Sequence, residues 1–310
     1  MSKSFRFGVQ IGGSFTPESF VTQARRAEEL GYSTMYFPDH FIDTELAPMV
    51  AMATAASATK TLKVGALVFD NDYKHPSILA KEVATIDVLS GGRTELGVGA
   101  GWMEVDYTAL GIPYDRPGVR IERLEEALQI IAGCYGPDAF SFSGAHYTVT
   151  DYQAIPKPTQ AHVPILIGGG GPRVLRLAGK YADIVGINPN MKAGTVTADA
   201  MTDSLAGMID QKVGWIKEGA GARFDDIELQ IRYFLASITD DRQRLANAVA
   251  PGFGVTAEDA LDAGLALVGT VDEVCDLMET RRERWGVSYA VIGGDEMEMF
   301  APVVERLTGK

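Results

Sequence analysis

Short apolar runs of the kind that form β-strands alternate with longer amphipathic segments of the kind that form helices, and the alternation occurs eight times. Strands separated by helices in this way run parallel, because each helix carries the chain back along the sheet. Eight such units in 310 residues predict a (β/α)8 TIM barrel, with a doubly wound sheet as the alternative. The expected strands are residues 5–11, 33–38, 62–69, 94–99, 163–167, 183–187, 228–234 and 288–292.

No linker, low-complexity tract or short repeat divides the chain, so we expect a single domain over residues 1–310. Residues 139–149 indicate a β-hairpin, which we expect to be an insertion at the C-terminal mouth rather than a barrel strand. Helical stretches are expected over 195–221 and from the seventh strand to Arg284. In barrels of this kind, the segments that follow the strands form one rim, where the enzymes keep their active sites.

Four consecutive glycines follow the fifth expected strand and lead directly into a helix: Gly168, Gly169, Gly170 and Gly171. The first N–H groups of a helix have no partner within it, and the helix dipole adds partial positive charge there. Such a turn suits a phosphate or carboxylate, and Arg173 would add a positively charged group. The alternative is a tight turn that needs glycine only for its backbone angles.

Acidic residues outnumber basic ones by 41 to 28, which gives a formal net charge of −13. Nucleic acid and anionic membrane surfaces are therefore poor partners, and an anionic cofactor needs a local positive site. The two cysteines, Cys134 and Cys275, lie in apolar helical contexts and are expected to be buried thiols. No Cys/His cluster has metal-ligand spacing, and no signal segment or membrane-length apolar run is found, so we expect a cytoplasmic protein without a metal site.

Four stretches together resemble the luciferase-like monooxygenase superfamily, and within it the oxidoreductases that use the deazaflavin coenzyme F420. The third stretch is the most specific, because it joins HP, a helix, LSGGR and GVGAGW in order. The resemblance implies a (β/α)8 barrel with a flavin or deazaflavin across its C-terminal mouth and the cofactor's phosphate against the glycine turn. The stretches are FGVQIG at 7–12, MYFPDHF at 35–41, VGALVFDNDYKHPSILAKEVATIDVLSGGRTELGVGAGW at 64–102 and PILIGGGGPRVLRLAGKYADIVGI at 164–187.

The resemblance also implies roles for individual residues. An Asp-His pair often ends the second strand of deazaflavin members, and Asp39 and His40 stand there in this chain. Asp39 is expected to hydrogen-bond the cofactor ring or its hydroxylated side chain. His40 is expected to face the ring and to donate or accept the substrate proton, as a group with a pKa near neutrality can. The alternative is that Asp39 caps the following segment and His40 packs beneath it.

Family members carry a non-prolyl cis peptide in a bulge at the end of the third strand, where it backs the ring. The matching place in this chain is near Ala66, Leu67 and Val68, so the resemblance implies that their backbone contacts the cofactor. A cis bond without proline costs about 3 kcal/mol and persists only where its surroundings enforce it.

Trp102 marks a departure from part of the family. Sugar-phosphate dehydrogenases of the group carry a glutamate directly after the glycines of strand four, so Trp102 argues against the glucose-6-phosphate reaction. Trp102 is expected to form an aromatic wall of the substrate pocket, or else to pack at the rim. His75 is expected either to contact cofactor or substrate, or to start a helix with a backbone partner. Glu104 and Asp106 are expected to be solvated loop charges.

These observations favour an oxidoreductase that transfers a hydride between coenzyme F420 and a small organic substrate. One alternative is an FMN-dependent monooxygenase fed by a separate flavin reductase. A non-redox barrel that binds a phosphorylated ligand is a third possibility, but neither Lys63 nor Lys180 is well placed for Schiff-base chemistry. The resemblance also implies a homodimer.

Overall fold

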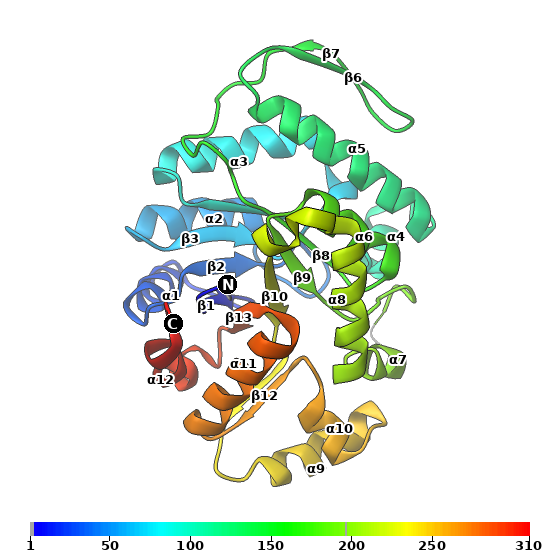
Figure 1. Ribbon diagram of the computed structural model, residues 1–310. Coiled ribbons are helices and arrows are strands. Elements are labelled where there is room, and N and C mark those ends of the chain that lie inside the picture. Colours follow the sequence, from blue (N-terminus) through cyan, green and yellow to red (C-terminus); the bar gives the residue numbers. More distant parts are fainter. Residues whose placement is uncertain (1–2, 196) are drawn as a thin grey trace.

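Eight parallel strand positions close into a barrel that helices surround, as Figure 1 shows for the computed structural model. The structure describes residues 3–195 and 197–310. The pairing of β3 with β5 closes the ring, so the predicted (β/α)8 barrel is confirmed and the doubly wound sheet is excluded. In order around the barrel the strands are β1 (Arg6–Gln10), β2 (Thr34–Phe37), β3 (Lys63–Ala66) continued by β4 (Phe69–Asp70), β5 (Thr94–Gly99), β8 (Ile165–Gly169), β9 (Ile184–Ile187), β10 (Glu228–Arg232) and β13 (Val287–Gly293).

The helices that surround the barrel begin where the sequence supplies start signals. Helices α1, α2, α3, α5 and α6 all begin at a proline, whose missing N–H is not needed in a first turn. Thr16 caps α1 by accepting a hydrogen bond from the Ser19 N–H at 3.2 Å. The helices are α1 (Pro17–Glu29), α2 (Pro48–Ala58), α3 (Pro76–Ser90), α5 (Pro117–Tyr135), α6 (Pro172–Tyr181), α8 (Ala206–Ala220), α11 (Val271–Trp285) and α12 (Met297–Leu307).

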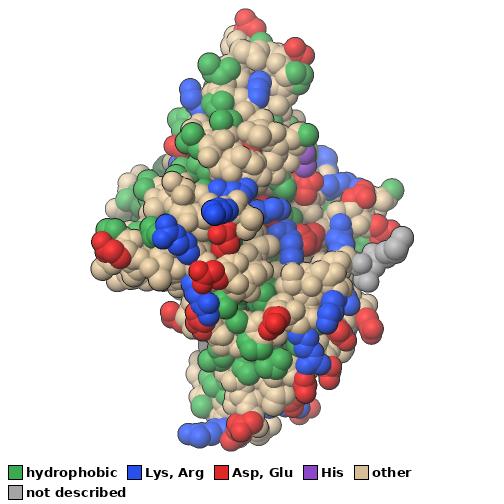
Figure 2. Space-filling model, turned by 90° about the vertical axis from the view of Figure 1, so that its left-hand side faces the viewer, with side chains coloured by type: hydrophobic (Ala, Val, Ile, Leu, Met, Phe, Trp, Pro, Cys, Tyr) green, Lys and Arg blue, Asp and Glu red, His purple; other side chains and the backbone are tan. Residues whose placement is uncertain are grey.

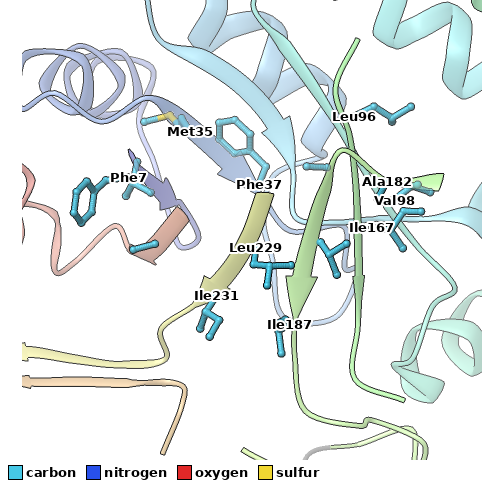
Figure 3. Packing of buried hydrophobic residues seen from close by; sticks show 14 of the residues in the cluster. Phe7, Met35, Phe37, Leu96, Val98, Ile167, Ala182, Ile187, Leu229 and Ile231 are labelled. Carbon is cyan, nitrogen blue, oxygen red and sulfur yellow. The ribbon is translucent and has the colours of Figure 1, made fainter. Parts of the chain in front are cut away.

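Alternate side chains of each strand enter two separate packing layers, because successive residues of a strand point to opposite faces. One set packs between the barrel and the helices; Figure 3 shows part of this layer, with Phe7, Met35 and Ile231. The other set points into the barrel and forms a small inner cluster of Tyr36, Leu166, Ile184, Tyr289 and Val291.

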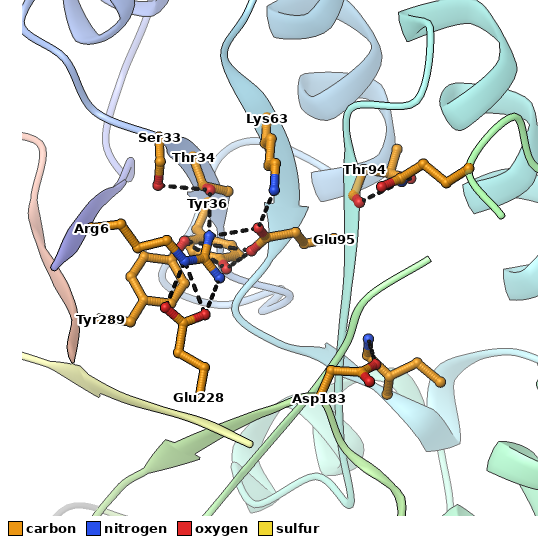
Figure 4. Close-up of polar contacts among 12 residues, drawn as sticks. Arg6, Ser33, Thr34, Tyr36, Lys63, Thr94, Glu95, Asp183, Glu228 and Tyr289 are labelled. Carbon is orange, nitrogen blue, oxygen red and sulfur yellow. Dashed lines mark hydrogen bonds and ion pairs between the residues drawn. The ribbon is translucent and has the colours of Figure 1, made fainter. Parts of the chain in front are cut away.

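The N-terminal end of the barrel is closed by charged and phenolic side chains, shown in Figure 4. Arg6 lies between two carboxylates, at 2.7 Å from Glu95 and 2.6 Å from Glu228. Burial acts to raise the pKa of Glu95, but the charges of Arg6 and Lys63 outweigh it and hold that pKa below its usual value. Because paired groups fill this end, we expect the active site at the opposite end of the barrel.

The hairpin expected over 139–149 is confirmed as β6 (Phe140–Ser143) and β7 (Thr148–Tyr152). The predicted helical stretch over 195–221 contains α7 (Ala198–Thr202) and α8, with residue 196 outside the described residues, as are residues 1 and 2. Two 3-10 helices complete the connections, η1 (Asn71–Tyr73) and η2 (Gly221–Asp226). Within the described residues, no helix combines the length and the apolar character needed to cross a membrane.

Two predictions of local structure are wrong. The segment after β5, taken as a loop, contains the short helix α4 (Glu104–Leu110), which ends at Gly111 with a φ of 69°. The segment from the seventh strand to Arg284, taken as helical, contains a parallel pair, β11 (Leu235–Ile238) and β12 (Ala266–Gly269), beside α9 (Arg242–Phe253) and α10 (Ala257–Asp262). Apolar runs of four residues do not distinguish strand from helix by periodicity, which explains the second error.

Candidate active site

Most of the residues singled out in the sequence lie at one end of the barrel, where the carboxyl ends of parallel strands meet. Asp39 and His40 follow β2, the bulge of Leu67 and Val68 separates β3 from β4, and Trp102 follows β5. The glycine turn lies at the end of β8, two positions further around the barrel from β4. This end, called the mouth below, is where barrel enzymes carry out their chemistry.

His40 is held by a buried carboxylate. Its Nδ1 lies 2.8 Å from Oδ2 of Asp106, whose side chain has 0% exposed surface, while the His40 side chain is 20% exposed. The other carboxylate oxygen, Oδ1, accepts hydrogen bonds from the N–H groups of Phe41 (3.1 Å) and Ile42 (3.0 Å). With the Asp106 carboxylate as the acceptor, Nδ1 is the donor, and a neutral ring then has its lone pair at Nε2.

Asp106 was expected to be a solvated loop charge, and that expectation is wrong. It lies on α4, whose buried residues are Asp106 and Tyr107. Glu104, on the same helix, is exposed as expected. Gly111, which ends α4, is a sequence signal for a helix that contains Asp106. The sequence gives no signal that Asp106 contacts His40, which lies 66 residues earlier in the chain.

Trp102 lies against His40. The two rings meet edge to face, with centroids 5.5 Å apart and an interplanar angle of 82°. The structure therefore brings the predicted aromatic wall and the predicted proton-transfer group together, and Trp102 restricts the orientation of the His40 ring.

Carboxyl groups make the neighbouring part of the mouth acidic. Asp39 accepts a hydrogen bond from the Asp70 N–H at 3.1 Å, and burial raises the pKa of Asp39 above its usual value. Burial also raises the pKa of Asp70, to about 7, against the opposing hydrogen bonds from the Asp72 N–H and the Tyr107 hydroxyl. The hydrogen bond that Asp39 accepts therefore joins the segment after β2 to the last residue of β4.

The peptide bond between Leu67 and Val68 is cis, at the place that the resemblance implies. The carbonyl of Leu67 accepts a hydrogen bond from Nε2 of Gln10 at 3.0 Å, and the Leu67 N–H donates to the Phe37 carbonyl at 2.9 Å. The side chains of Leu67 and Val68 pack against the inner barrel cluster, whereas Ala66 belongs to the layer between barrel and helices. The backbone of the bulge is thus held by the neighbouring strand β2 and by a side chain that reaches across from β1.

The four glycines have different structural roles. Gly168 and Gly169 are the last residues of β8, which extends two residues beyond the predicted strand. A Cβ on Gly169 would lie 2.4 Å from Val174 Cγ1, and one on Gly170 would lie 2.3 Å from the carbonyl carbon of Pro189, so packing alone requires glycine at both positions. A Cβ on Gly168 or Gly171 would meet no atom closer than 3.4 Å.

The start of α6 has the properties of an anion site. Gly171 is its N-cap, no side chain among the described residues caps it, and its first turn holds no acidic residue. The free N–H groups there include those of Arg173 and Val174, because Pro172 has none and Leu175 donates to the Gly171 carbonyl. Uncapped N–H groups beside open glycine positions fit the phosphate of a flavin-type cofactor.

Two further predicted residues have partners within the protein. The Arg173 side chain is exposed, and its Nη2 donates to Glu122 at 2.9 Å. His75 is the N-cap of α3, with Nδ1 accepting from the Ser77 N–H at 3.2 Å, which is the structural alternative considered for it. Among the described residues, no group of three or more His, Cys, Asp and Glu is arranged to hold a metal ion.

Comparison with known proteins places these features in a family. Residues 2–289 match the profile of the luciferase-like monooxygenases. The chain is 29% identical over 243 residues to an F420-dependent glucose-6-phosphate dehydrogenase of Amycolatopsis mediterranei, covering 75% of this chain and 69% of that one. It is 28% identical to 5,10-methylenetetrahydromethanopterin reductase of Archaeoglobus fulgidus, covering 78% and 67% of the two chains. It is 35% identical to an FMNH2-dependent dimethylsulfone monooxygenase of Pseudomonas putida, over only 44% and 38%.

Solved structures agree on the fold. The F420-dependent tetrahydromethanopterin reductase of Methanopyrus kandleri superposes with a TM-score of 0.78 at 20% identity, covering 98% of this chain and all of that one. An F420-dependent secondary alcohol dehydrogenase superposes with a TM-score of 0.79 at 18% identity, covering 98% and 99%. The predicted family and the prediction of an enzyme are confirmed. The chain belongs to the luciferase-like monooxygenase family.

Proposed function

We propose that this protein is an oxidoreductase that transfers a hydride between coenzyme F420 and a small organic substrate. The observation that carries the proposal is the pair of His40 and Asp106, held at the mouth beside the bulge of Leu67 and Val68. The relatives named as F420-dependent, which share 29–30% identity with the chain over 176–243 residues, support the deazaflavin over FMN.

The residues at the mouth divide the task of holding the cofactor. The N–H groups at the start of α6 would bind its phosphate, with Gly168 and Gly171 leaving room. The backbone at Leu67 and Val68 would support the ring, and Asp39 would accept a hydrogen bond from it. The bound deazaflavin supplies a carbon centre that accepts or releases hydride.

His40 would move the proton that accompanies the hydride. Asp106 fixes its tautomer and orientation, so that Nε2 accepts the proton of a substrate hydroxyl during oxidation and returns it during reduction. Trp102 packs against the His40 ring and excludes water from that side. No carboxylate stands at position 102, so His40 is the proton-transfer group that we assign.

Titration of the purified protein with F420 and with FMN tests this proposal. We expect F420 to bind with a Kd below about 10 μM, followed by its fluorescence, and FMN to bind at least about tenfold more weakly. Binding of FMN alone would refute the deazaflavin assignment.

An FMN-dependent monooxygenase served by a flavin reductase is the second candidate. The similarity to the dimethylsulfone monooxygenase favours it, although that similarity covers 44% of this chain. Reduced FMN and an organic substrate should then support rapid oxygen uptake. We expect no substrate-dependent uptake, because the protein should not bind reduced FMN tightly enough to direct its reaction with oxygen.

We also propose that two copies pair through the outer surface of α2 and α3. This surface carries exposed hydrophobic side chains: Val50 is 68% exposed, Ile78 53% and Leu89 79%. Figure 2 views the molecule from the side that carries α1, α2 and α3, where hydrophobic side chains gather among charged ones. Contiguous apolar surface of this kind is typical of a protein interface.

Replacing Leu89 with lysine should convert the dimer into a monomer, because a two-fold interface brings the substitution in twice and buries two charges. Light scattering coupled to size exclusion measures the mass directly. Leu110→Lys, at a residue 48% exposed on α4, is the matched control and should leave the mass unchanged. A monomeric wild-type protein would refute the interface.

A further inference from the structure

Arg232 is an inward-facing cation at the mouth. It is the last residue of β10, in which Leu229 and Ile231 pack toward the helices and Glu228, Gln230 and Arg232 point into the barrel. Glu228 is bonded to Arg6 at the N-terminal end of the barrel, so Arg232, four residues later, lies at the opposite end. The residues around Arg232 form no motif, so the sequence gives no signal for it.

Arg232 has partners that hold it but do not neutralise it. Its Nε donates to Oε1 of Gln10 at 2.9 Å, and its Nη1 donates to the Tyr233 carbonyl. Within residues 3–195 and 197–310, Nη2 makes no hydrogen bond and no carboxylate lies within 4.0 Å of the guanidinium. Arg6, at the other end of the barrel, is instead paired with two carboxylates. Arg232 is therefore fixed in place with one free donor group.

The surroundings of Arg232 leave its charge partly unbalanced. Burial lowers the pKa of Arg232 to about 10, and the charge of Glu296 offsets this only in part. Nη2 and the Glu296 carboxylate flank Gly293: a Cβ there would lie 3.0 Å from Nη2 and 2.2 Å from Oε2. A Cβ at this position would collide with Oε2 of Glu296, so glycine lets that carboxylate come close to Nη2 without pairing with it.

The side chain of Gln230, the inward-facing residue that precedes Arg232 on β10, holds a second hydrogen-bond donor without an acceptor. Gln230 is 1% exposed, and its Nε2 has no hydrogen-bond partner among the described residues. Buried donors are almost always paired, so an unpaired amide beneath a free guanidinium nitrogen indicates that an acceptor is missing from this part of the barrel.

Gln10 links Arg232 to the bulge: its Oε1 accepts from Arg232 Nε at 2.9 Å and its Nε2 donates to the Leu67 carbonyl at 3.0 Å. Around the barrel, β10 is two positions from β8 and three from β2, so Arg232 lies between the glycine turn and His40 on the arc that β9, β13 and β1 complete. His40 follows β2, the next strand after β1. A substrate bound at Arg232 would therefore reach His40 across the mouth ends of β13 and β1.

We propose that Arg232, positioned by Gln10, binds a carboxylate of the substrate. The substrate class would then be small organic acids that carry a hydroxyl or a carbonyl group, with the anion at Nη2 and the reacting carbon near His40. Guanidinium groups bind carboxylates through charge-assisted hydrogen bonds, and a free Nη2 offers two N–H donors. Binding of the carboxylate at Arg232 does not depend on the proposed function; only the hydride transfer that follows binding rests on it.

Binding measured without turnover tests the inference. 2-Hydroxy acids of increasing chain length, each paired with its primary amide, are titrated into the protein by calorimetry. We expect at least one acid to bind about 10–100-fold more tightly than its amide. Arg232→Gln should abolish this preference, and Arg232→Lys should keep part of it. Equal affinity of acids and amides for the wild-type protein would overturn the proposal, as would an unchanged preference in Arg232→Gln.

Two controls separate this result from other effects. Arg284→Gln removes an exposed arginine that pairs with Asp210 and should leave the preference intact. The Kd for F420 should stay within a few-fold in Arg232→Gln; a large loss there, with the acid preference retained, would assign Arg232 to the ring and refute the proposal. If the wild-type protein binds acids but not F420, the proposed function fails while the carboxylate site stands.

Discussion

Replacing His40 with alanine is expected to lower kcat by about 10²–10⁴ while the Kd for F420 stays within a few-fold. The imidazole is 20% exposed and is held by a buried partner, with Nδ1 at 2.8 Å from Asp106. The rate of F420 reduction, measured with the alcohol or hydroxy acid that gives the fastest wild-type turnover, provides the test. Unchanged turnover would remove His40 from the mechanism.

We expect Asp106 to affect turnover through His40, and a double-mutant cycle distinguishes that role from its structural role in binding the Phe41 and Ile42 N–H groups. Asp106→Asn should lower kcat by about 10–10², because an amide can donate to Nδ1 and stabilise the wrong tautomer. In the His40→Ala background the same change should cost almost nothing more. Glu104→Gln, on the same helix, is the matched control and should be silent. Independent, additive losses would contradict the pairing.

Gly171→Asp is expected to weaken F420 binding by about 10²–10³ while leaving the protein as stable as the wild type or more so. An aspartate at an N-cap accepts hydrogen bonds from the first turn of its helix, which is worth about 1 kcal/mol, and its charge repels a phosphate at the same N–H groups. The backbone at Gly171, with a φ of −91°, accepts any residue, and a Cβ there meets only Asn190 at 3.5 Å.

Fluorescence titration and thermal unfolding measure these two effects separately. Gly171→Asn is the matched control, since it competes for the same N–H groups without charge and should cost less affinity. A raised Tm with unchanged affinity would show that the phosphate binds elsewhere. Gly169→Val is a poor test, because its side chain would collide with Val174 whether or not a ligand is bound.

The sequence was sufficient for the barrel because its signals are local and repeated. Each strand is an apolar run, and the predicted bounds of β5 are the observed ones. Five of the helices between the strands begin at a proline. The bulge at Leu67 and Val68 was predicted from the resemblance to the family and not from the local pattern of apolar residues. The segments at 235–238 and 266–269 were missed because each is too short to show a period.

The site was less predictable because it depends on contacts between distant segments. Asp106 meets His40 only once α4 forms, and Arg232 meets Gln10 across 222 residues of chain. Glycines that pack against Val174 and Pro189 are identical in sequence to those that leave space for a ligand. Burial and pairing, which distinguish these cases, exist only in the folded chain.

A crystal structure of the protein with F420 tests the central claim most directly. The account predicts the phosphate within hydrogen-bond distance, about 2.7–3.2 Å, of the N–H groups at the start of α6. It also predicts the ring against the backbone of Leu67 and Val68, with Nε2 of His40 facing its reacting carbon. A phosphate bound away from Gly171, or a ring with its reacting carbon turned away from His40, would contradict it.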